Sequence, residues 1–483
     1  MNETKNAILN LSLYSAANLL RTRALSSREL TQAYLDSIEE RDGEIGAYLT
    51  VCKKEAINQA ELADKLLRDG NAPSMLTGIP FSVKDNFCTK GIRTTCASRM
   101  LENYVPPYDA HVIELLNQQG AVMLGKVNMD EFAMGCTTET SAFKKTLNPL
   151  DPLRAPGGSS GGSVASVAAR EAVFSIGSDT GGSIRQPAAF CGVVGMKPSY
   201  GRISRYGMIA FSSSLDTVGL ATRSVRDSAI LLSALSGRDA HDATSADRTD
   251  NDFVSGIKAG VCGMRFAFVR ESLRGASECV RKNTQIAIDT LRSLGASVLE
   301  VSLPVAEFAL CAYHIIGSSE ASSNLARFDG IRFGYHADGC DEVGELIRRS
   351  RSEGFGDEVK RRIILGTYSL AAENFDEYYK KAVSVREYLK CELDLLFEKF
   401  DAIITPTSPT EAYRFDRSGD FTDEYLSDAY TVLASMAQLP AISVPSGKGE
   451  GGMPTALQII TNKFEDARAL RISYALSEAL WTE

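Results

Sequence analysis

The 483-residue sequence lacks several features that mark common classes of protein. It has no run of about 18 apolar residues, so no membrane-spanning helix is expected. Its ten cysteines form no CxxC pair and no tight cluster, which argues against a zinc site and against a disulfide scaffold. Free thiols favour a reducing compartment, and residues 1–20 fit an amphipathic helix better than a signal peptide. We therefore expect a cytoplasmic protein without a metal site.

An excess of positive charge is also absent. The net charge is −9, with 44% hydrophobic and 23% charged residues. An acidic balance of this kind argues against a nucleic-acid-binding surface over the whole molecule. The composition is otherwise that of an ordinary globular protein, and a chain of this length can bury a large core.

Helical and strand-like segments alternate along most of the chain, which predicts an α/β fold with helices on both faces of a sheet. Residues 7–70 have helical periodicity, and Ser26 and Glu29 form a capping box before an apolar helical stripe. Residues 78–86 have the pattern of a short strand, and residues 306–400 are mostly helical. No low-complexity linker and no internal repeat divides the chain, so one compact unit is expected.

Two glycine-serine clusters lie close together, at residues 157–163 and 179–183. A flexible linker would have polar flanks, but the residues between and after these clusters are apolar. A phosphate-binding loop would need a GxxxxGK[ST] or GxGxxG pattern, and the first cluster has neither. Glycine lets the backbone approach a ligand closely, and successive N–H groups at 179–183 can form an anion-binding nest. Beside a nucleophile such a nest acts as an oxyanion hole.

A serine nucleophile at Ser183 would need a base. None of the four histidines lies in a glycine-rich or strand-end motif, so a Ser-His-Asp arrangement is not favoured. Lys84 ends the apolar stretch 78–86, and a lysine held among apolar residues can act as a neutral base. Taken alone, Lys84 would be interpreted as a solvated surface charge; its combination with the two clusters favours a catalytic role.

The motifs "GIPFSVKDN" (78–86), "APGGSSGGS" (155–163) and "GSDTGGSIRQPAAFCGVVGMKPSYGRIS" (177–204) carry a family resemblance. Over nearly its whole length the chain resembles the amidase signature hydrolases. The resemblance implies an amidase signature fold with a large, mixed, mostly parallel central sheet. It places the amidase signature domain at residues 71–483, with the N-terminal helical segment 1–70 packed on its core.

The same resemblance implies a serine–serine–lysine triad. Lys84 would be the base, Ser159 the bridging serine and Ser183 the nucleophile, with the two serines 24 residues apart. The backbone N–H groups of Thr180, Gly181 and Gly182, with that of Ser183, would stabilise the oxyanion. The expected reaction is amide hydrolysis through an acyl-serine, without a cofactor in this chain.

Residues 125–143, 320–335 and 352–370 are similar to one branch of the family, the A subunits of aspartyl/glutamyl-tRNA amidotransferases. That similarity implies hydrolysis of glutamine and delivery of ammonia to a partner subunit. The partner amidates glutamate or aspartate on a mischarged tRNA. The expected partners are the B and C subunits of a heterotrimer. ATP and Mg²⁺ would bind at the partner subunit, and aminoacyl-tRNA would be contacted only through it.

Glutamine carries an α-carboxylate and an α-ammonium group, so a selective pocket needs one cation and one anion. By position in the branch motifs, Arg362 would bind the carboxylate and Asp428 the ammonium group. Tyr313 and the loop that contains Met129 and Gly135 would line the pocket.

Some positions leave alternatives open. Composition does not distinguish Arg362 from Arg361, and both would otherwise be interpreted as a solvated helix face. Leu433, Ser435 and Gln438 stand where the branch usually has proline, asparagine and glycine. These departures keep open a stand-alone amidase that acts on another small carboxamide. A non-catalytic scaffold is disfavoured because the lysine and both serines are present.

Overall fold

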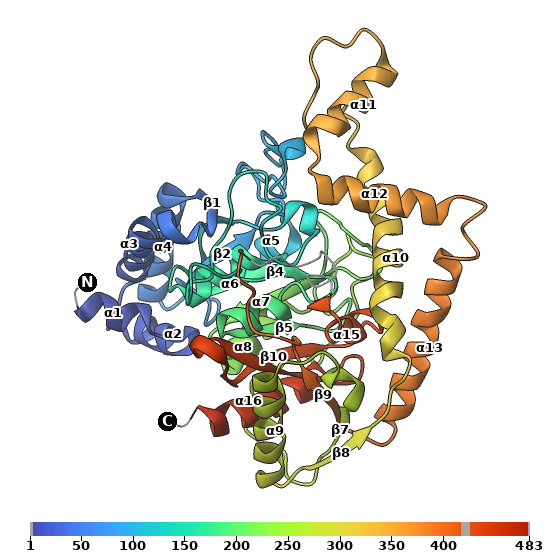
Figure 1. Ribbon diagram of the computed structural model, residues 1–483. Helices are drawn as coiled ribbons and strands as arrows, with labels where there is room; N and C mark the ends of the chain where they lie inside the picture. Colours follow the sequence, from blue (N-terminus) through green and yellow to red (C-terminus); the bar gives the residue numbers. More distant parts are fainter. Residues whose placement is uncertain (1–2, 417–425, 482–483) are drawn as a thin grey trace.

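The computed structural model describes residues 3–416 and 426–481, and within them eleven strands form one continuous sheet (Figure 1). The strands are β1 (Tyr48–Val51), β2 (Pro80–Lys84), β3 (Val122–Val127), β4 (Phe174–Asp179), β5 (Val194–Lys197), β6 (Thr217–Thr222), β7 (Arg265–Val269), β8 (Ser297–Val301), β9 (Ala402–Pro406), β10 (Ala441–Lys448) and β11 (Pro454–Ile460). Their order in the sheet is β1-β3-β2-β4-β6-β5-β10-β11-β9-β7-β8.

The sheet is mixed, as expected, but the expectation that it is mostly parallel is wrong. Of the ten strand pairings among the described residues, four are parallel: β2 with β3, β2 with β4, β7 with β8 and β7 with β9. The other six are antiparallel. One reason is local: only residues 449–453 separate β10 from β11, and a connection this short joins antiparallel strands.

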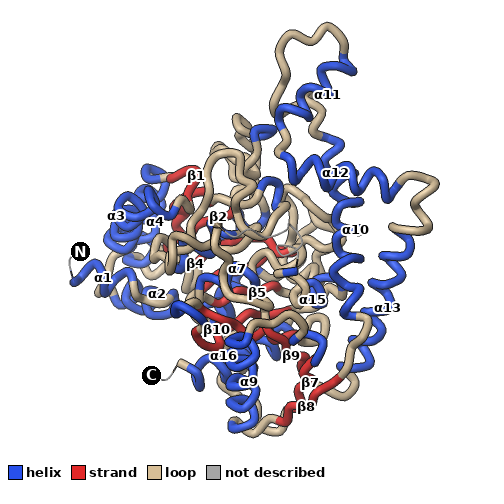
Figure 2. The backbone as a smooth tube through the Cα atoms, viewed as in Figure 1, coloured by secondary structure: helices blue, strands red, loops and turns tan. Residues whose placement is uncertain are grey.

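Helices surround the sheet in the tube view (Figure 2). They are α1 (Glu3–Leu9), α2 (Leu13–Thr22), α3 (Ser27–Ile45), α4 (Lys53–Arg68), α5 (His111–Gln118), α6 (Gly161–Ala168), α7 (Arg185–Cys191), α8 (Val225–Leu235), α9 (Glu278–Ser293), α10 (Ala306–Asn324), α11 (Val343–Gly354), α12 (Asp357–Leu370), α13 (Tyr379–Phe397), α15 (Val432–Met436) and α16 (Asp466–Leu480).

Helices cover both faces of the sheet, which confirms that part of the expectation. In β7, Phe266 packs into the hydrophobic cluster that includes α8, α9 and α16, whereas its neighbour Ala267 packs into the cluster that includes α10, α13 and α15. In β6, Leu220 and Ala221 divide in the same way, Ala221 facing α6 and α7. Successive side chains of a strand point to opposite faces, so each face has its own core.

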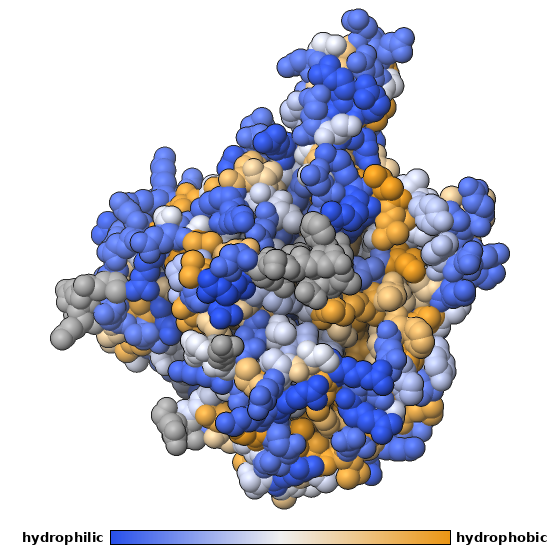
Figure 3. All heavy atoms as spheres, in the orientation of Figure 1, coloured by the Kyte–Doolittle hydropathy of each residue, from blue (hydrophilic) through white to orange (hydrophobic). Residues whose placement is uncertain are grey.

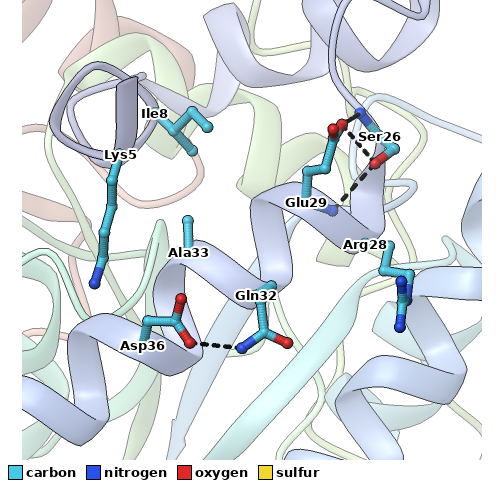
Figure 4. A pocket seen from close by; sticks show the side chains of 8 residues that line it. All are labelled: Lys5, Ile8, Ser26, Arg28, Glu29, Gln32, Ala33 and Asp36. Atoms are coloured by element: carbon cyan, nitrogen blue, oxygen red, sulfur yellow. Dashed lines mark hydrogen bonds between the residues drawn. The ribbon is translucent and has the colours of Figure 1, made fainter. Parts of the chain in front are cut away.

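The N-terminal segment contains the predicted capping box. The Ser26 side chain accepts a hydrogen bond from the Glu29 backbone N–H, and the Glu29 carboxylate accepts one from the Ser26 N–H, at the start of α3 (Figure 4). Leu13 and Leu30 belong to the main hydrophobic cluster, and β1 is an edge strand paired with β3. The division of the chain into residues 1–70 and 71–483 stays a prediction.

Residues 306–400 are mostly helical, as expected, and they extend from the rest of the molecule in the view of Figure 1. Helix α10 packs along both α12 and α13. Apolar side chains are exposed on and after α12, among them Ile364, Leu365, Tyr368 and Phe375, and Figure 3 shows hydrophobic residues on this side of the molecule. Among the described residues, no helix combines the length and the hydropathy that crossing a membrane requires.

Candidate active site

Lys84 is the last residue of β2, and its side chain is fully buried. Its Nζ lies within hydrogen-bond distance of three serine hydroxyls: Ser159 Oγ at 2.8 Å, Ser160 Oγ at 2.8 Å and Ser178 Oγ at 2.9 Å. A hydroxyl can donate or accept a hydrogen bond, so this surrounding accommodates either an ammonium group or a neutral amine.

Burial lowers the pKa of Lys84 to about 7. Taking the ammonium group out of water disfavours its charged form, and the more distant carboxylates of Asp130, Asp179 and Asp216 oppose this effect only in part. Near neutral pH a large fraction of Lys84 is therefore uncharged and able to accept a proton.

The two glycine-serine clusters lie against each other. Ser159 and Ser160 immediately precede α6, and Ser183 lies between β4 and α7. The Ser160 N–H donates to the Ser183 carbonyl over 3.1 Å, and the Asp130 N–H donates to the Ser159 carbonyl over 3.1 Å. The structure thus brings Lys84 and Ser159 into direct contact and ties the Ser183 backbone to the residue next to Ser159.

The loop of residues 180–183, which we call the oxyanion loop after the role that the sequence predicts for it, is closely packed at its two glycines. A Cβ at Gly181 would lie 2.5 Å from the ring of Tyr313. A Cβ at Gly182, whose φ is +151°, would lie 2.2 Å from Thr431 Oγ1. The Thr431 hydroxyl donates to the Gly181 carbonyl over 2.6 Å. The glycines therefore allow α10 and the segment before α15 to close on this loop.

A buried ion pair that the sequence motifs did not reveal supports the oxyanion loop. Arg185 donates through Nε and Nη2 to the two carboxylate oxygens of Asp179, at 2.9 and 2.8 Å. The same guanidinium donates to the Thr431 carbonyl, the Ser435 hydroxyl and Gln458 Oε1. Asp179 and Arg185 both lie in the third motif, where their spacing can be read from the sequence. Nothing in the sequence indicates that Thr431, Ser435 and Gln458 are their partners.

The predicted substrate residues approach the oxyanion loop from two directions. Tyr313 comes from α10 and contacts Gly181, while Asp428 Oδ1 lies 3.0 Å from where a Gly182 Cβ would stand. Burial raises the pKa of Tyr313, so its phenol stays protonated. Asp428 is buried, its Oδ1 has no hydrogen-bond partner among the residues described, and burial followed by the nearby Asp179 charge raises its pKa to about 7.

The two adjacent arginines on α12 face different environments. The Arg362 side chain is 8% exposed, its Nε donates to Glu358 Oε1 over 2.8 Å, and its guanidinium lies 5.4 Å from the Phe211 ring centroid. The Arg361 side chain is 47% exposed and pairs with the same Glu358. The structure therefore places Arg362 inward and Arg361 outward.

The loop that contains Met129 and Gly135 is built on Asp130. Met129 is fully buried in an apolar cluster with Phe132 and Phe211. Gly135 is packed so closely that a Cβ there would lie 2.4 Å from Asp130 Cγ. Asp130 accepts the Thr138 N–H and the Thr140 hydroxyl, at 3.0 and 2.9 Å. Direct contact of Met129 or Gly135 with a substrate stays a prediction.

Comparison with known proteins identifies relatives of the whole chain. The Amidase family profile matches residues 29–470. The glutamyl-tRNA(Gln) amidotransferase A subunit of Caldanaerobacter subterraneus subsp. tengcongensis is 50% identical over 474 residues, which cover 98% of this chain and 97% of that protein. The Staphylococcus aureus (strain MRSA252) protein of the same name is 49% identical over 465 residues and covers 96% of each chain.

A solved structure agrees with these relatives. The crystal structure of the glutamyl-tRNA(Gln) amidotransferase A subunit from Thermotoga maritima superposes with a TM-score of 0.81 at 40% identity. The match covers 98% of this chain and 95% of that one. The similarity thus extends over nearly the whole architecture.

Proposed function

The chain belongs to the Amidase family, and on that premise we infer that it is the glutamine-hydrolysing subunit of a tRNA-dependent amidotransferase, an enzyme of the carbon–nitrogen ligase type. The observation that carries the chemistry is the Lys84 amine, buried and 2.8 Å from the Ser159 hydroxyl. The near full-length identity to A subunits of glutamyl-tRNA(Gln) amidotransferases supports glutamine as the amide that is hydrolysed.

In the proposed mechanism Ser183 Oγ attacks the carbonyl carbon of the glutamine side-chain amide. Its proton passes to Ser159 Oγ as the Ser159 proton passes to Lys84 Nζ. The N–H groups of the oxyanion loop stabilise the tetrahedral oxyanion. The proton then returns through Ser159 to the leaving nitrogen, the C–N bond breaks, and ammonia departs. Water attacks the acyl-serine by the same route and releases glutamate.

Recognition of glutamine follows from its two charged α-substituents. Arg362 binds the α-carboxylate, and Asp428 binds the α-ammonium group through the oxygen that faces the oxyanion loop. Tyr313 closes the pocket over Gly181, and the loop of Met129 and Gly135 completes its wall. A buried carboxylate without a hydrogen-bond donor is costly, so an incoming ammonium group supplies the missing partner.

The ammonia is used by a partner. We infer a heterotrimer with B and C subunits, in which the partner converts Glu-tRNA(Gln), Asp-tRNA(Asn) or both to the amide. ATP and Mg²⁺ act at the partner subunit, and aminoacyl-tRNA is bound through it, in keeping with the net charge of −9 on this chain. None of the ten cysteines, all of which lie among the described residues, forms a disulfide, which supports a reducing cytoplasmic location.

The decisive experiment is ammonia release from glutamine by this chain, alone and with its B and C partners. Robust glutamine hydrolysis in the complex, abolished in Ser183→Ala, is the expected result. Rapid hydrolysis of aryl or fatty amides with glutamine ignored would contradict the proposal. A chain that never co-purifies with a tRNA-binding subunit would also contradict it.

A stand-alone amidase of the same family is the second candidate, and the departures after Asp428 are the observation that favours it. Gln438 adopts a φ of +61°, a conformation that glycine takes more readily, and donates to the Ser214 carbonyl over 3.3 Å. Leu433 is buried in the core, and Ser435 accepts a hydrogen bond from Arg185. If these three substitutions adapt the pocket to a different amide, glutamine turnover stays slow with every partner present, while another small carboxamide is hydrolysed quickly.

A further inference from the structure

The segment from Phe211 to Asp216 touches both ends of the candidate glutamine site. At one end Asp216, which is buried, accepts a hydrogen bond from Thr180 Oγ1 over 2.6 Å. Its other carboxylate oxygen accepts the backbone N–H groups of Phe211 and Ser212, both at 2.9 Å. One carboxylate therefore closes the segment into a turn and holds the first residue of the oxyanion loop.

At the other end the segment supports Arg362. The Phe211 ring is buried, and its centroid lies 5.4 Å from the Arg362 guanidinium carbon. Glu358 holds the same guanidinium through Nε. A planar guanidinium is attracted to the face of an aromatic ring, so ring and carboxylate together restrict how Arg362 is oriented.

The segment is itself anchored to two long helices. Glu320 of α10 accepts the Ser212 hydroxyl over 2.7 Å and the Ser214 N–H over 2.9 Å. Arg386 of α13 donates to the Ser214 hydroxyl over 2.8 Å and, through Nε, to the Met436 carbonyl of α15 over 3.0 Å. These bonds fix the segment relative to the elements that surround the pocket.

We propose that residues 211–216 are a positioning segment for the amidase reaction, in which Asp216 orients the oxyanion loop through Thr180 and Phe211 orients Arg362 toward the substrate carboxylate. This inference rests on the proposed glutaminase function. In glutamine the reacting amide and the α-carboxylate are a fixed number of bonds apart. A site that selects glutamine must therefore hold the oxyanion donors and the cation at a fixed separation. One short segment that contacts both groups can set that separation.

The Asp216 end is tested by kcat for glutamine in the assembled complex. Thr180→Val and Asp216→Asn should each lower kcat by about 10- to 100-fold with KM changed less than about threefold, because the displaced N–H donors bind the oxyanion of the transition state and not the ground-state substrate. Thr180→Ser, which keeps the hydroxyl, should restore most of the kcat that Thr180→Val loses. Asp216→Asn leaves one acceptor oxygen to serve both Thr180 and the N–H groups of Phe211 and Ser212. The double variant Thr180→Val/Asp216→Asn should therefore lose less than the product of the two single losses, since both variants weaken the same link between Thr180 and Asp216.

The Phe211 end is tested by comparing two substrates. Phe211→Leu should raise KM for glutamine by about tenfold while leaving kinetics with γ-aminobutyramide, which lacks the α-carboxylate, unchanged. Phe328→Leu is the matched control, because its ring belongs to the same apolar cluster but packs on Phe132, Phe333 and Phe355. In the control variant the ratio of KM for glutamine to KM for γ-aminobutyramide should equal that of the wild type.

The possible outcomes distinguish failure of the positioning role from failure of the proposed glutaminase function. Wild-type complex without glutaminase activity would overturn the proposed function and, with it, the positioning role. Active wild type with additive losses in the double variant would overturn the role of Asp216 alone, since two independent structural defects add. Equal KM shifts for both substrates in Phe211→Leu, or no shift, would overturn the role of Phe211.

Discussion

Two lysines, Lys84 and Lys126, lie at the ends of neighbouring parallel strands, and both are fully buried. Lys126 Nζ lies 3.3 Å from the Asp85 carboxylate and donates to the Phe87 carbonyl and the Thr94 hydroxyl. Lys84 Nζ has three hydroxyls around it instead. Because Val83 is the register partner of Lys126, the next residue along β2, Lys84, points to the opposite face of the sheet.

The two lysines are equally buried but face different hydrogen-bond partners. Beside the Thr94 hydroxyl, Lys126 faces a carboxylate and a carbonyl, which only accept hydrogen bonds. Hydroxyls accept or donate, so Lys84 can release its proton without leaving an unsatisfied neighbour. Lys84 and Lys126 thus have the same exposure and lie close together in the sheet, but they differ in the hydrogen-bonding groups that surround each amine.

The largest expected effect comes from removing the amine of Lys84. Lys84→Met should lower kcat for glutamine by about 10³-fold or more, because the serine relay loses its proton acceptor. Lys84→Arg should be equally inactive, since a guanidinium does not deprotonate. Ammonia release at saturating glutamine measures both. Near-native rates at neutral pH in either variant would refute the base assignment.

Lys126→Met should act on stability instead. It leaves the Asp85 carboxylate buried without its cation, so the free energy of unfolding should fall by about 3–5 kcal/mol. Denaturant unfolding measures this loss, and kcat of the folded fraction should stay within about threefold of wild type. The double variant Lys126→Met/Asp85→Asn should recover part of the stability. A fully stable Lys126→Met protein would remove the contrast between the two lysines.

The pH dependence of the rate should follow the neutral amine. With the pKa of Lys84 at about 7, kcat should be level above that pH and fall by up to tenfold per unit below it, because the protonated lysine accepts no proton. The pKa of Asp428 is also about 7, and its protonation removes the ammonium partner, so kcat/KM should fall more steeply than kcat. Steady-state rates on a pH series decide this; a rate that rises toward acid would contradict it.

The smallest effect is expected for Ser178, one of the two serines next to Lys84 whose hydroxyls have no part in the relay. Ser178→Ala removes one of three hydrogen-bond partners of Nζ, and a neutral hydrogen bond contributes about 1 kcal/mol. We expect kcat to fall by about fivefold, with glutamine KM unchanged. Ser159→Ala, measured beside it, should lose far more, and equal losses in the two variants would argue against the distinct role of Ser159.

The sequence predicted most strands and helices because apolar runs and caps are local signals, as at Ser26 and in β2. The expectation of helix throughout residues 7–70 was wrong at Tyr48–Val51, which form β1 because they pair with the distant strand β3. Strand direction was mispredicted because it depends on which distant strands become neighbours: β5 pairs with β10, more than two hundred residues later. The contact between Lys84 and Ser159 was anticipated from motif resemblance. Ser160 and Ser178 were not, because nothing local distinguishes them from the other serines of those motifs.

Arg185 has a consequence for how the site forms during folding. Its guanidinium joins Asp179 to the Thr431 carbonyl and to Gln458, which lies in β11. Gln458 is 273 positions from Arg185 along the chain. The loop that carries Ser183 is therefore fully supported only after segments this distant have packed together, so the site should be among the last parts of the fold to become ordered.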